Sequence, residues 1–219
     1  MRNGDFLLHF KEQELILTPE KALYWSNKEA LVLSDVHFGK SGHFRKAGIP
    51  IPNSINQNNF ERLDTLIKHF NPKNILFLGD LFHSDRNSEW EEFQNWRKNK
   101  KEIGMYLAIG NHDFHSLEEY ESIGLLCSRS IELLPFILLH NSEEIKADEK
   151  LYSISGHIHP SVKLTGKGRQ SIKIPCFYFG NTFAILPAFG SFTGTHSIKP
   201  KTKELVFGVL NNQIIEILS

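Results

Sequence analysis

Acidic and histidine side chains follow several apolar runs in this chain, and their types are those of metal ligands. The first such stretch is Leu31–Lys40, where apolar and small residues lead into Asp35-Val-His37. Side chains two residues apart on a strand point to the same side. A strand ending here would therefore present a carboxylate and an imidazole together. A lone Asp-x-His is weak, because two polar residues that begin a loop have the same pattern, so the rest of the chain decides its meaning.

Four further runs stop at residues of the same kind. In chain order, the five groups are Asp35/His37, Asp80, Asn111-His112-Asp113, His140 and His157/His159. Each group alone has a structural explanation, since a strand-end Asp can cap the next helix. Five repeats of one arrangement are hard to attribute to chance. Together they predict a site at the carboxyl ends of the strands, where α/β sheets bind their ligands.

This inventory of side chains suits a pair of divalent metal ions. Two ions about 3.5–4 Å apart need a carboxylate that bridges them. Asp80 is the natural bridge, because it stands alone after Gly79, which lets the backbone approach closely. Nitrogen and oxygen ligands without thiolate favour Mn, Fe, Zn or Co over Mg or Ca, and we expect Mn. A site with few formal negative charges leaves the ions electropositive and ready for an anionic substrate.

Apolar periodicity predicts the elements that position these residues. Strands are expected at Phe6–Phe10, Glu14–Leu17, Ala22–Trp25, Leu31–Ser34, Asn74–Leu78, Met105–Ile109, Ile131–Leu139, Leu151–Ser155, Ile172–Phe179, Thr182–Leu186, Leu205–Leu210 and Gln213–Leu218. Helices are expected at Ile55–Phe70, Ser88–Lys101 and Ser116–Ile123. Strands alternate with helices first and then follow one another directly. This order predicts an α/β sandwich with mixed sheets, formed by one domain over residues 1–219.

Composition bounds the class of protein. The chain has 219 residues, of which 40% are apolar, enough for a sizeable core. No run approaches the ~18 apolar residues of a membrane span, and the N-terminus lacks the pattern of a signal peptide. Cys127 and Cys176 lack metal-ligand spacing and are expected to be small buried hydrophobes rather than a disulfide. A cytoplasmic protein that does not contact a membrane is predicted.

Charge is balanced in total but not along the chain. The 25 basic and 25 acidic residues give no net charge, which by itself argues against a nucleic-acid binder. Residues 150–203, however, contain no Asp or Glu and eight Lys or Arg, and residues 36–60 contain only Lys40, Arg45 and Lys46 as charged residues. Either these are ordinary solvated surfaces, or they form a positive field for a phosphate-bearing substrate.

The motifs resemble those of the calcineurin-like metallophosphoesterases. The matching set is Asp35-x-His37, Gly79-Asp80, Gly110-Asn111-His112-Asp113, His140 and Gly156-His157-x-His159. The stretches Asp35–Pro52, Gly79–His83 and Leu186–Gly194 are similar to the bacterial DNA-ligase-associated branch, described as DNA damage response phosphodiesterases or endonucleases. The resemblance implies a four-layer α/β/β/α sandwich.

Carried over by motif, the resemblance implies how the metal ligands divide. One ion would be held by Asp35, His37, His159 and the bridge Asp80, and the other by Asp80, Asn111, His140 and His157. His112 would stay unligated and either stabilise the transition state or protonate the leaving oxygen. Asp113 would orient the His112 ring, although a helix cap explains it equally well. For His83, a role in supporting the metal ligands and no role at the site are equally open.

These residues and the resemblance lead to a functional hypothesis. The protein is expected to be a dinuclear phosphodiesterase in which a metal-bridging hydroxide attacks phosphorus in line, with Lys40, Arg45 and Lys46 binding the substrate. DNA is the favoured substrate, in a repair role with a DNA ligase or another nuclease as possible partner. Alternatives are a nucleotide or lipid pyrophosphate hydrolase, a hydrolase of small phosphodiesters or phosphomonoesters, and, from another class, a non-catalytic subunit of a ligase–nuclease assembly.

Overall fold

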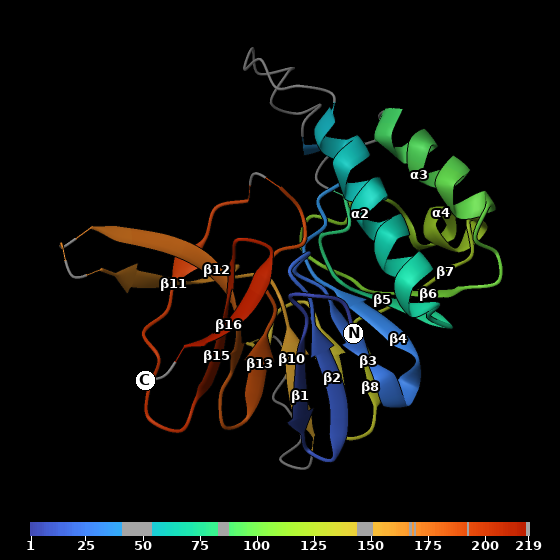
Figure 1. The fold of residues 1–219 in the computed structure, drawn as a ribbon. Helices are drawn as coiled ribbons and strands as arrows, with labels where there is room; N and C mark the ends of the chain where they lie inside the picture. The colour runs from blue at the N-terminus through green and yellow to red at the C-terminus, as the bar shows by residue number, and fades with distance from the viewer. Residues whose placement is uncertain are drawn as a thin grey trace.

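Two β-sheets pack face to face, with helices outside one of them (Figure 1). This is a computed structural model of the chain, and it describes residues 1–40, 54–82, 88–143, 151–166, 168, 170–191 and 193–217. The predictions for Arg45, Lys46 and His83 lie outside these residues.

The first sheet has seven strands whose spatial order follows the chain. They are β1 (Phe6–Phe10), β2 (Gln13–Leu17), β3 (Leu23–Trp25), β4 (Ala30–Leu33), β5 (Asn74–Leu78), β6 (Gly104–Ala108) and β7 (Leu125–Ser128). Strands β1 to β4 are antiparallel, whereas β4 to β7 are parallel. Parallel neighbours need crossover connections, and these carry α2 (Ser54–Phe70), α3 (Ser88–Lys98) and α4 (Leu117–Ser122). A short 3-10 turn, η1 (Ser26–Lys28), joins β3 to β4.

The second sheet takes its strands from the remainder of the chain. They are β8 (Ser130–Leu133), β9 (Phe136–Leu139), β10 (Tyr152–Ser155), β11 (Pro160–Thr165), β12 (Ser171–Phe179), β13 (Phe183–Ile185), β14 (His196–Ser197), β15 (Leu205–Leu210) and β16 (Gln213–Ile217). Their main order is β14-β11-β12-β13-β10-β9-β8, and β15 pairs with both β12 and β16. Strands β9, β10 and β13 are parallel, and the others join mostly as antiparallel neighbours.

Successive residues of the central strands point to two different cores. On β4, Val32 faces the second sheet, in a buried cluster with Trp25 and Phe136. Its neighbours Leu31 and Leu33 face the helices instead, in a cluster that includes Leu63 of α2, Phe93 of α3 and Tyr120 of α4. This near-continuous apolar run is typical of parallel strands that are covered on both faces.

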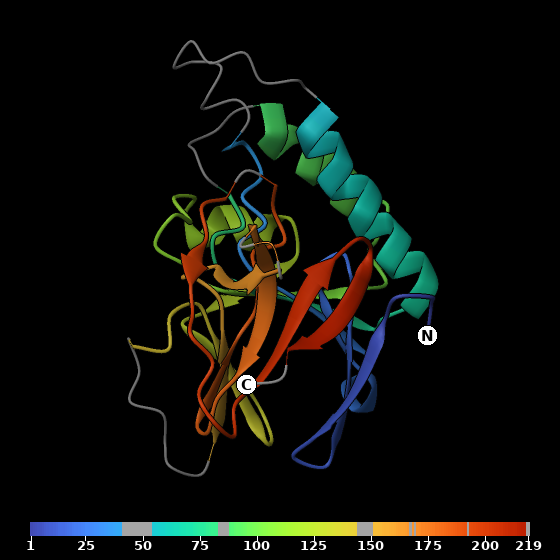
Figure 2. The ribbon, with the colours of Figure 1, turned by 60° about the vertical axis from the view of Figure 1, so that its left-hand side comes forward.

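The predicted α/β class with two mixed sheets is confirmed. Within the described part of the chain, the helices lie over the first sheet, and Figures 1 and 2 show α2 and α3 side by side there. The outer face of the second sheet has its own apolar cluster, built around Val162, Ile174, Cys176 and Val206. No described helix covers this face, because strands β8 to β16 follow one another without crossover helices in the described part of the chain.

Most predicted elements are present with small shifts of their ends, and one is divided. The run expected as a single strand at Ile131–Leu139 forms β8 and β9, an antiparallel pair that turns at Leu134-Pro135. Strands β7, β11 and β14 had not been predicted. Both cysteines are free, and Cys176 is buried. None of the helices described here is long and apolar enough to cross a membrane.

Candidate active site

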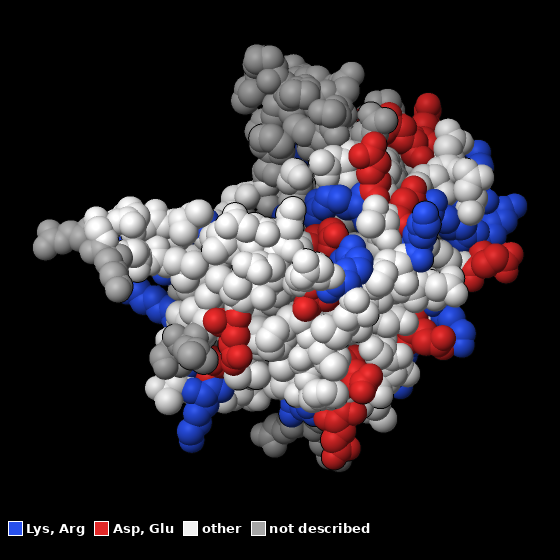
Figure 3. Space-filling model, viewed as in Figure 1, with Lys and Arg blue, Asp and Glu red and all other residues white. Residues whose placement is uncertain are grey.

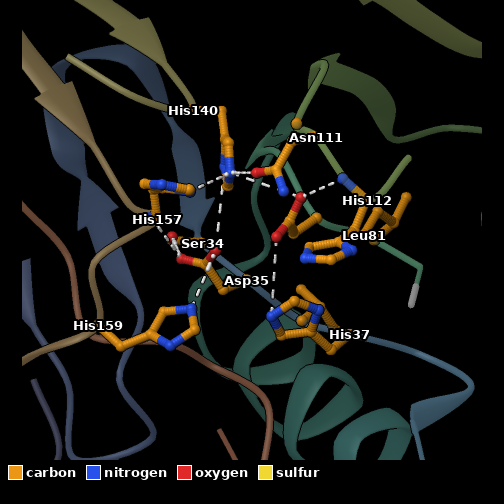
Figure 4. A network of polar contacts seen from close by, with 12 residues as sticks. Ser34, Asp35, His37, Leu81, Asn111, His112, His140, His157 and His159 are labelled. Atoms are coloured by element: carbon orange, nitrogen blue, oxygen red, sulfur yellow. Dashed lines mark hydrogen bonds and ion pairs between the residues drawn. The ribbon is translucent and has the colours of Figure 1, made fainter. Parts of the chain in front are cut away.

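The loops that follow five strands converge at one rim of the sandwich (Figure 4). The first sheet contributes Asp35 and His37 after β4, Asp80 after β5, and Asn111 and His112 after β6. The second sheet contributes His140 after β9 and His157 and His159 after β10. The structure therefore brings together all seven predicted metal ligands.

The predicted metal ligands lie in loops beyond the strand ends, and several of them have left-handed backbone angles. β4 ends at Leu33, and both Asp35 and His37 have positive φ angles, of 50° and 51°. Asp80, His157 and His159 also lie in this left-handed region, which non-glycine residues adopt rarely. The expectation that Asp35 and His37 meet because a pleated strand directs them to the same side is therefore wrong. A tight turn of the loop brings Asp35 and His37 together, and such backbone strain is typical of functional sites.

Two glycines let these loops approach closely. At Gly156, a Cβ atom would lie 1.6 Å from Ser34 Oγ and 2.4 Å from Asp35 Oδ2. At Gly79, whose φ is 74°, it would overlap the ring of His140. Any side chain at these positions would separate the two sheets at the site. The glycines beside the ligand motifs thus have a steric cause.

One group of donor atoms surrounds Asp35. Its Oδ1 lies 3.3 Å from Nε2 of His159, and neither buried atom has a hydrogen-bond partner among the described residues. The other ring nitrogen of His159, Nδ1, donates to the carbonyl of Gly194 at 2.9 Å. A carbonyl can only accept, so this bond leaves the Nε2 lone pair directed at the site. His37 Nε2 completes the group, 3.9 Å from Oδ2 of Asp80.

A second group surrounds Nε2 of His140. This atom lies 3.0 Å from Asn111 Oδ1, 3.0 Å from His157 Nδ1 and 3.4 Å from Asp80 Oδ1. His140 Nδ1 donates to the carbonyl of Leu78 at 3.0 Å, so Nε2 again carries the lone pair. The four donor atoms therefore point at a common space.

The spacing of these atoms suits divalent metal ions. Ligand atoms at ~2.1 Å from an ion and at right angles to each other are about 3.0 Å apart. Two of the contacts of His140 Nε2 have this separation. A cation between Asp35 Oδ1 and His159 Nε2, which have no hydrogen-bond partner among the described residues, would offset their burial. Asp80 faces both groups, with Oδ1 toward His140 and Oδ2 toward His37. The donor set therefore fits two ions with Asp80 between them.

The pKa values of the two buried carboxylates, Asp35 and Asp80, are shifted in opposite directions. Burial alone would raise the pKa of Asp35, but the nearby His159 ring, the charge of His140 and the Ser34 hydroxyl outweigh it and hold that pKa below its usual value. For Asp80, burial raises the pKa, and the charge of His140 and the His112 N–H oppose this only in part. Bound cations would favour the ionised form of both groups.

Asp113 binds the backbone around Asp80 and Gly110. Its Oδ2 accepts the N–H groups of Asp80 and Gly110 at 2.9 and 2.8 Å, and its Oδ1 accepts those of Leu81 and Phe82. The carboxylate thus fixes the backbone around Asp80, the predicted bridge. The orientation of the His112 ring by Asp113 stays a prediction. Burial raises the pKa of Asp113 to about 6, despite these N–H donors. Asp113 is not the cap of α4, because Ser116 caps that helix with a capping box.

His112 lies at the edge of the site, next to the ligands. Its backbone N–H donates to Asp80 Oδ1 at 2.9 Å, and its ring centroid is 6.0 Å from that of His37. The loop that places Asn111 among the donor atoms therefore places the His112 ring beside the first group (Figure 4). This position suits a group that acts on the substrate.

Residues 29–180 match the family of calcineurin-like phosphoesterases. The chain belongs to that family. The phosphoesterase is therefore a hydrolase that acts on phosphoester bonds, and its family uses divalent metals of the kind its donor atoms suit.

Two relatives differ in how much of the phosphoesterase they cover. The crystal structure of Pseudomonas putida nuclease MPE superposes with a TM-score of 0.82 and 26% identity, over 97% of this chain and 100% of that one. A transmembrane protein with a metallophosphoesterase domain from Danio rerio is 26% identical over 112 residues, 51% of this chain. The phosphoesterase spans only 22% of the length of that protein.

Lys40 is the one predicted substrate-binding residue in the described part. Partial burial lowers the pKa of Lys40, while the charges of Asp35 and Asp80 oppose this shift, so its ammonium group lies within the field of the ligands. Sequence reasoning missed the supports of the site, such as the Gly194 carbonyl behind His159. It also missed Lys21 and Arg62, which donate to the carbonyls of Gly190 and Phe189. These partners are distant in sequence, and no local pattern indicates them.

Proposed function

We propose that this phosphoesterase is a dinuclear metal-dependent phosphodiesterase that cleaves DNA. The observation that carries the dinuclear part is the position of Asp80, whose two oxygens face separate groups of donor atoms. A carboxylate that lies between two groups of ligand atoms is the arrangement that two-metal hydrolases need.

Several observations support DNA as the substrate. The similarity to the Pseudomonas putida nuclease extends over nearly the whole chain. Lys40 adds a positive charge beside the metal groups, and residues 150–203 contain no acidic residue. A phosphodiester backbone carries one charge for each nucleotide, so positive charge that extends beyond the site favours a polymer over a single phosphate.

The residues divide the work of in-line displacement. Two divalent ions, with Mn as our first expectation, would polarise the phosphoryl oxygens and activate water when bound. Asp35, His37, His159, Asp80, Asn111, His140 and His157 would hold them. The carbonyls of Leu78 and Gly194 keep two of these imidazoles in the tautomer that can ligate. Lys40 would bind a substrate phosphate.

His112 is proposed to act on the leaving group. Its ring lies beside the ligands, and its main chain is tied to the bridging carboxylate. A protonated imidazole here could donate its proton to the departing oxygen, which in DNA is a poor leaving group. We further propose that the protein acts in the cytoplasm in DNA repair, and that a DNA ligase is a plausible partner for an enzyme that cuts strands.

Activity of Mn-loaded protein on four substrates tests this proposal. The substrates are supercoiled plasmid, short oligonucleotides, bis-p-nitrophenyl phosphate and p-nitrophenyl phosphate. We expect plasmid nicking and a preference for the diester over the monoester. The variant His140→Ala, purified in the same way, controls for contaminating nucleases. A preference for the monoester would contradict a phosphodiesterase, and intact plasmid during rapid turnover of the small diester would contradict DNA as substrate.

A further inference from the structure

A two-stranded hairpin leads away from the metal-ligand loops. β11 begins at Pro160, directly after His159, and pairs antiparallel with β12. Beyond its contact with β14, the hairpin projects from the body of the molecule, on the side opposite α2 and α3 (Figure 1). Whatever binds along it is therefore continuous with the site.

The two faces of this hairpin differ in chemistry. Val162 and Ile174 are opposite each other on one face and pack into the apolar cluster outside the second sheet. The other face has Lys163 opposite Lys173, and further along the hairpin Thr165 opposite Ser171. These four side chains are exposed. We call this set, Lys163, Thr165, Ser171 and Lys173, the hydroxyl–lysine face.

The paired lysines create positive charge that an anion would offset. Like charges directly opposite each other on neighbouring strands are destabilising, and no acidic residue occurs between 150 and 203 to offset them. Lys173 is held in place, because its Nζ donates to the carbonyl of Thr195 at 2.6 Å. In the face that Figure 3 shows, the projecting hairpin carries no acidic atoms. Within residues 150–203, the charge on this strip thus has no acidic partner.

We propose that the hydroxyl–lysine face binds the phosphate backbone of a DNA strand that leads out of the active site. This inference rests on the proposed function and adds to it the path of the substrate. Lys, Ser and Thr side chains are common partners of phosphate oxygens and set the position of a strand without reading its sequence. The face lacks an exposed aromatic side chain among its described residues, so its contacts are with the backbone and not with the bases.

The length of the hairpin gives the length of DNA that it contacts. Lys163 is four residues from His159, and a strand rises about 3.3 Å per residue, which places it about 13 Å along the chain from that ligand. A stacked strand advances about 3.4 Å along its axis for each nucleotide and its phosphate. Lys163 therefore meets a phosphate about four nucleotides from the one at the metals. A dinucleotide is too short to reach it, whereas an octamer is long enough.

Inhibition by oligothymidylates of increasing length tests the path. The Mn-loaded protein hydrolyses bis-p-nitrophenyl phosphate while phosphorothioate oligomers of 2, 4, 8 and 12 nucleotides compete, at salt concentrations from 0.05 to 0.3 M. For Lys163→Ala/Lys173→Ala, we expect the inhibition constant of the 8-mer and 12-mer to rise about 25-fold at 0.1 M salt. The slope of log K against log salt should fall by about 1.4, because each lysine that no longer neutralises a phosphate lowers it by about 0.7. The inhibition constant of the dinucleotide should not change.

A matched pair of lysines serves as control. Lys98 and Lys101, also exposed, lie at the end of α3 on the other side of the molecule, and Lys98→Ala/Lys101→Ala should leave every inhibition constant as in the parent. If the hairpin variant behaves like this control while long oligomers still inhibit, the path is wrong and the DNA-cleaving function stands. An equal loss for the dinucleotide would also overturn it. If no oligomer inhibits the parent protein, the proposed function fails together with the path.

Discussion

Asp80 Oδ1 lies 3.4 Å from Nε2 of His140. The first residue follows a strand of the first sheet and the second follows a strand of the second sheet. The other Asp80 oxygen faces His37 on the opposite side. Asp80, the proposed shared ligand, thus stands where the two sheets meet, and its loss should affect both groups of ligand atoms.

The substitution Asp80→Asn should reduce metal content. It removes the formal charge of the bridge, and an amide can offer only one oxygen to the two groups. Elemental analysis of purified variant should show well under two ions per chain. Glu132→Gln, an exposed acid-to-amide change on β8, should retain the parent's content. Two tightly bound ions and full activity in Asp80→Asn would show that Asp80 is not the bridge.

The substitution His112→Ala should separate chemistry from binding. If the ring protonates the leaving oxygen, both ions stay bound, KM changes little and kcat on DNA falls by roughly 10²–10⁴. The loss should be smaller for a p-nitrophenyl diester, because p-nitrophenolate leaves without a proton. Equal losses on both substrates would favour stabilisation of the phosphoryl oxygens instead. A variant that lacks one ion would make His112 a ligand.

The substitution Asp113→Asn should destabilise the protein. The carboxylate accepts four backbone N–H groups, and an amide nitrogen cannot accept the two that face it. Each buried donor left without a partner costs about 1–3 kcal/mol, so urea unfolding should show a loss of about 2–6 kcal/mol for the two donors. Metal affinity should fall as well, since the Asp80 backbone loses its anchor. An unchanged stability with only a shifted pH–rate profile would favour the role of orienting His112.

Lys21 should make stability rise with pH. Burial lowers the pKa of Lys21 from 10.5 to about 7, so between these values the unfolded chain holds a proton that the folded chain lacks. The free energy of unfolding should therefore increase with pH above about 7, by about 1.4 kcal/mol per pH unit from this residue. Lys21→Met should remove that increase.

Urea unfolding of parent and Lys21→Met between pH 6.5 and 9, without added metal, measures this difference. Burial raises the pKa of both cysteine thiols to about 12, and their contribution opposes that of Lys21 near pH 9. It is the same in both proteins and cancels when the curves are subtracted. Parallel curves for the two proteins would mean that Lys21 is charged in the folded state.

The sequence was informative where a signal is local. The run Asn74–Leu78 and the Gly79-Asp80 that follows it needed only nearby residues to be read as a strand and a ligand, and β5 has these bounds. The Ile131–Leu139 run was misread, because Pro135 interrupts the strand and a hairpin forms around it. β11 was missed because it begins with a proline and includes Lys163, which hides its apolar alternation.

The geometry of the site depends on contacts that no local pattern carries. The carboxylate of Asp113 bonds to residues 31 to 33 positions away, so its role could not be read from its neighbours His112 and Phe114. The left-handed turns at Asp35 and His37 are stabilised by hydrogen bonds to the β5 loop, from Asp35 N–H to Gly79 O and from His37 N–H to Asp80 O. The residue types indicated the candidate ligands, and the long-range backbone bonds determine how they meet.

The division of the ligands between the sheets has a mechanical consequence. Asp35, His37, Asp80 and Asn111 move with one sheet, and His140, His157 and His159 move with the other. Ions bound between these two sets of residues would link the two sheets at the rim. Pulling the sheets apart would then need more force at that rim when metal is present than when it is absent. Conversely, a change deep in the shared core, such as at Trp25 against Phe136, would alter the spacing of the ions without touching any ligand.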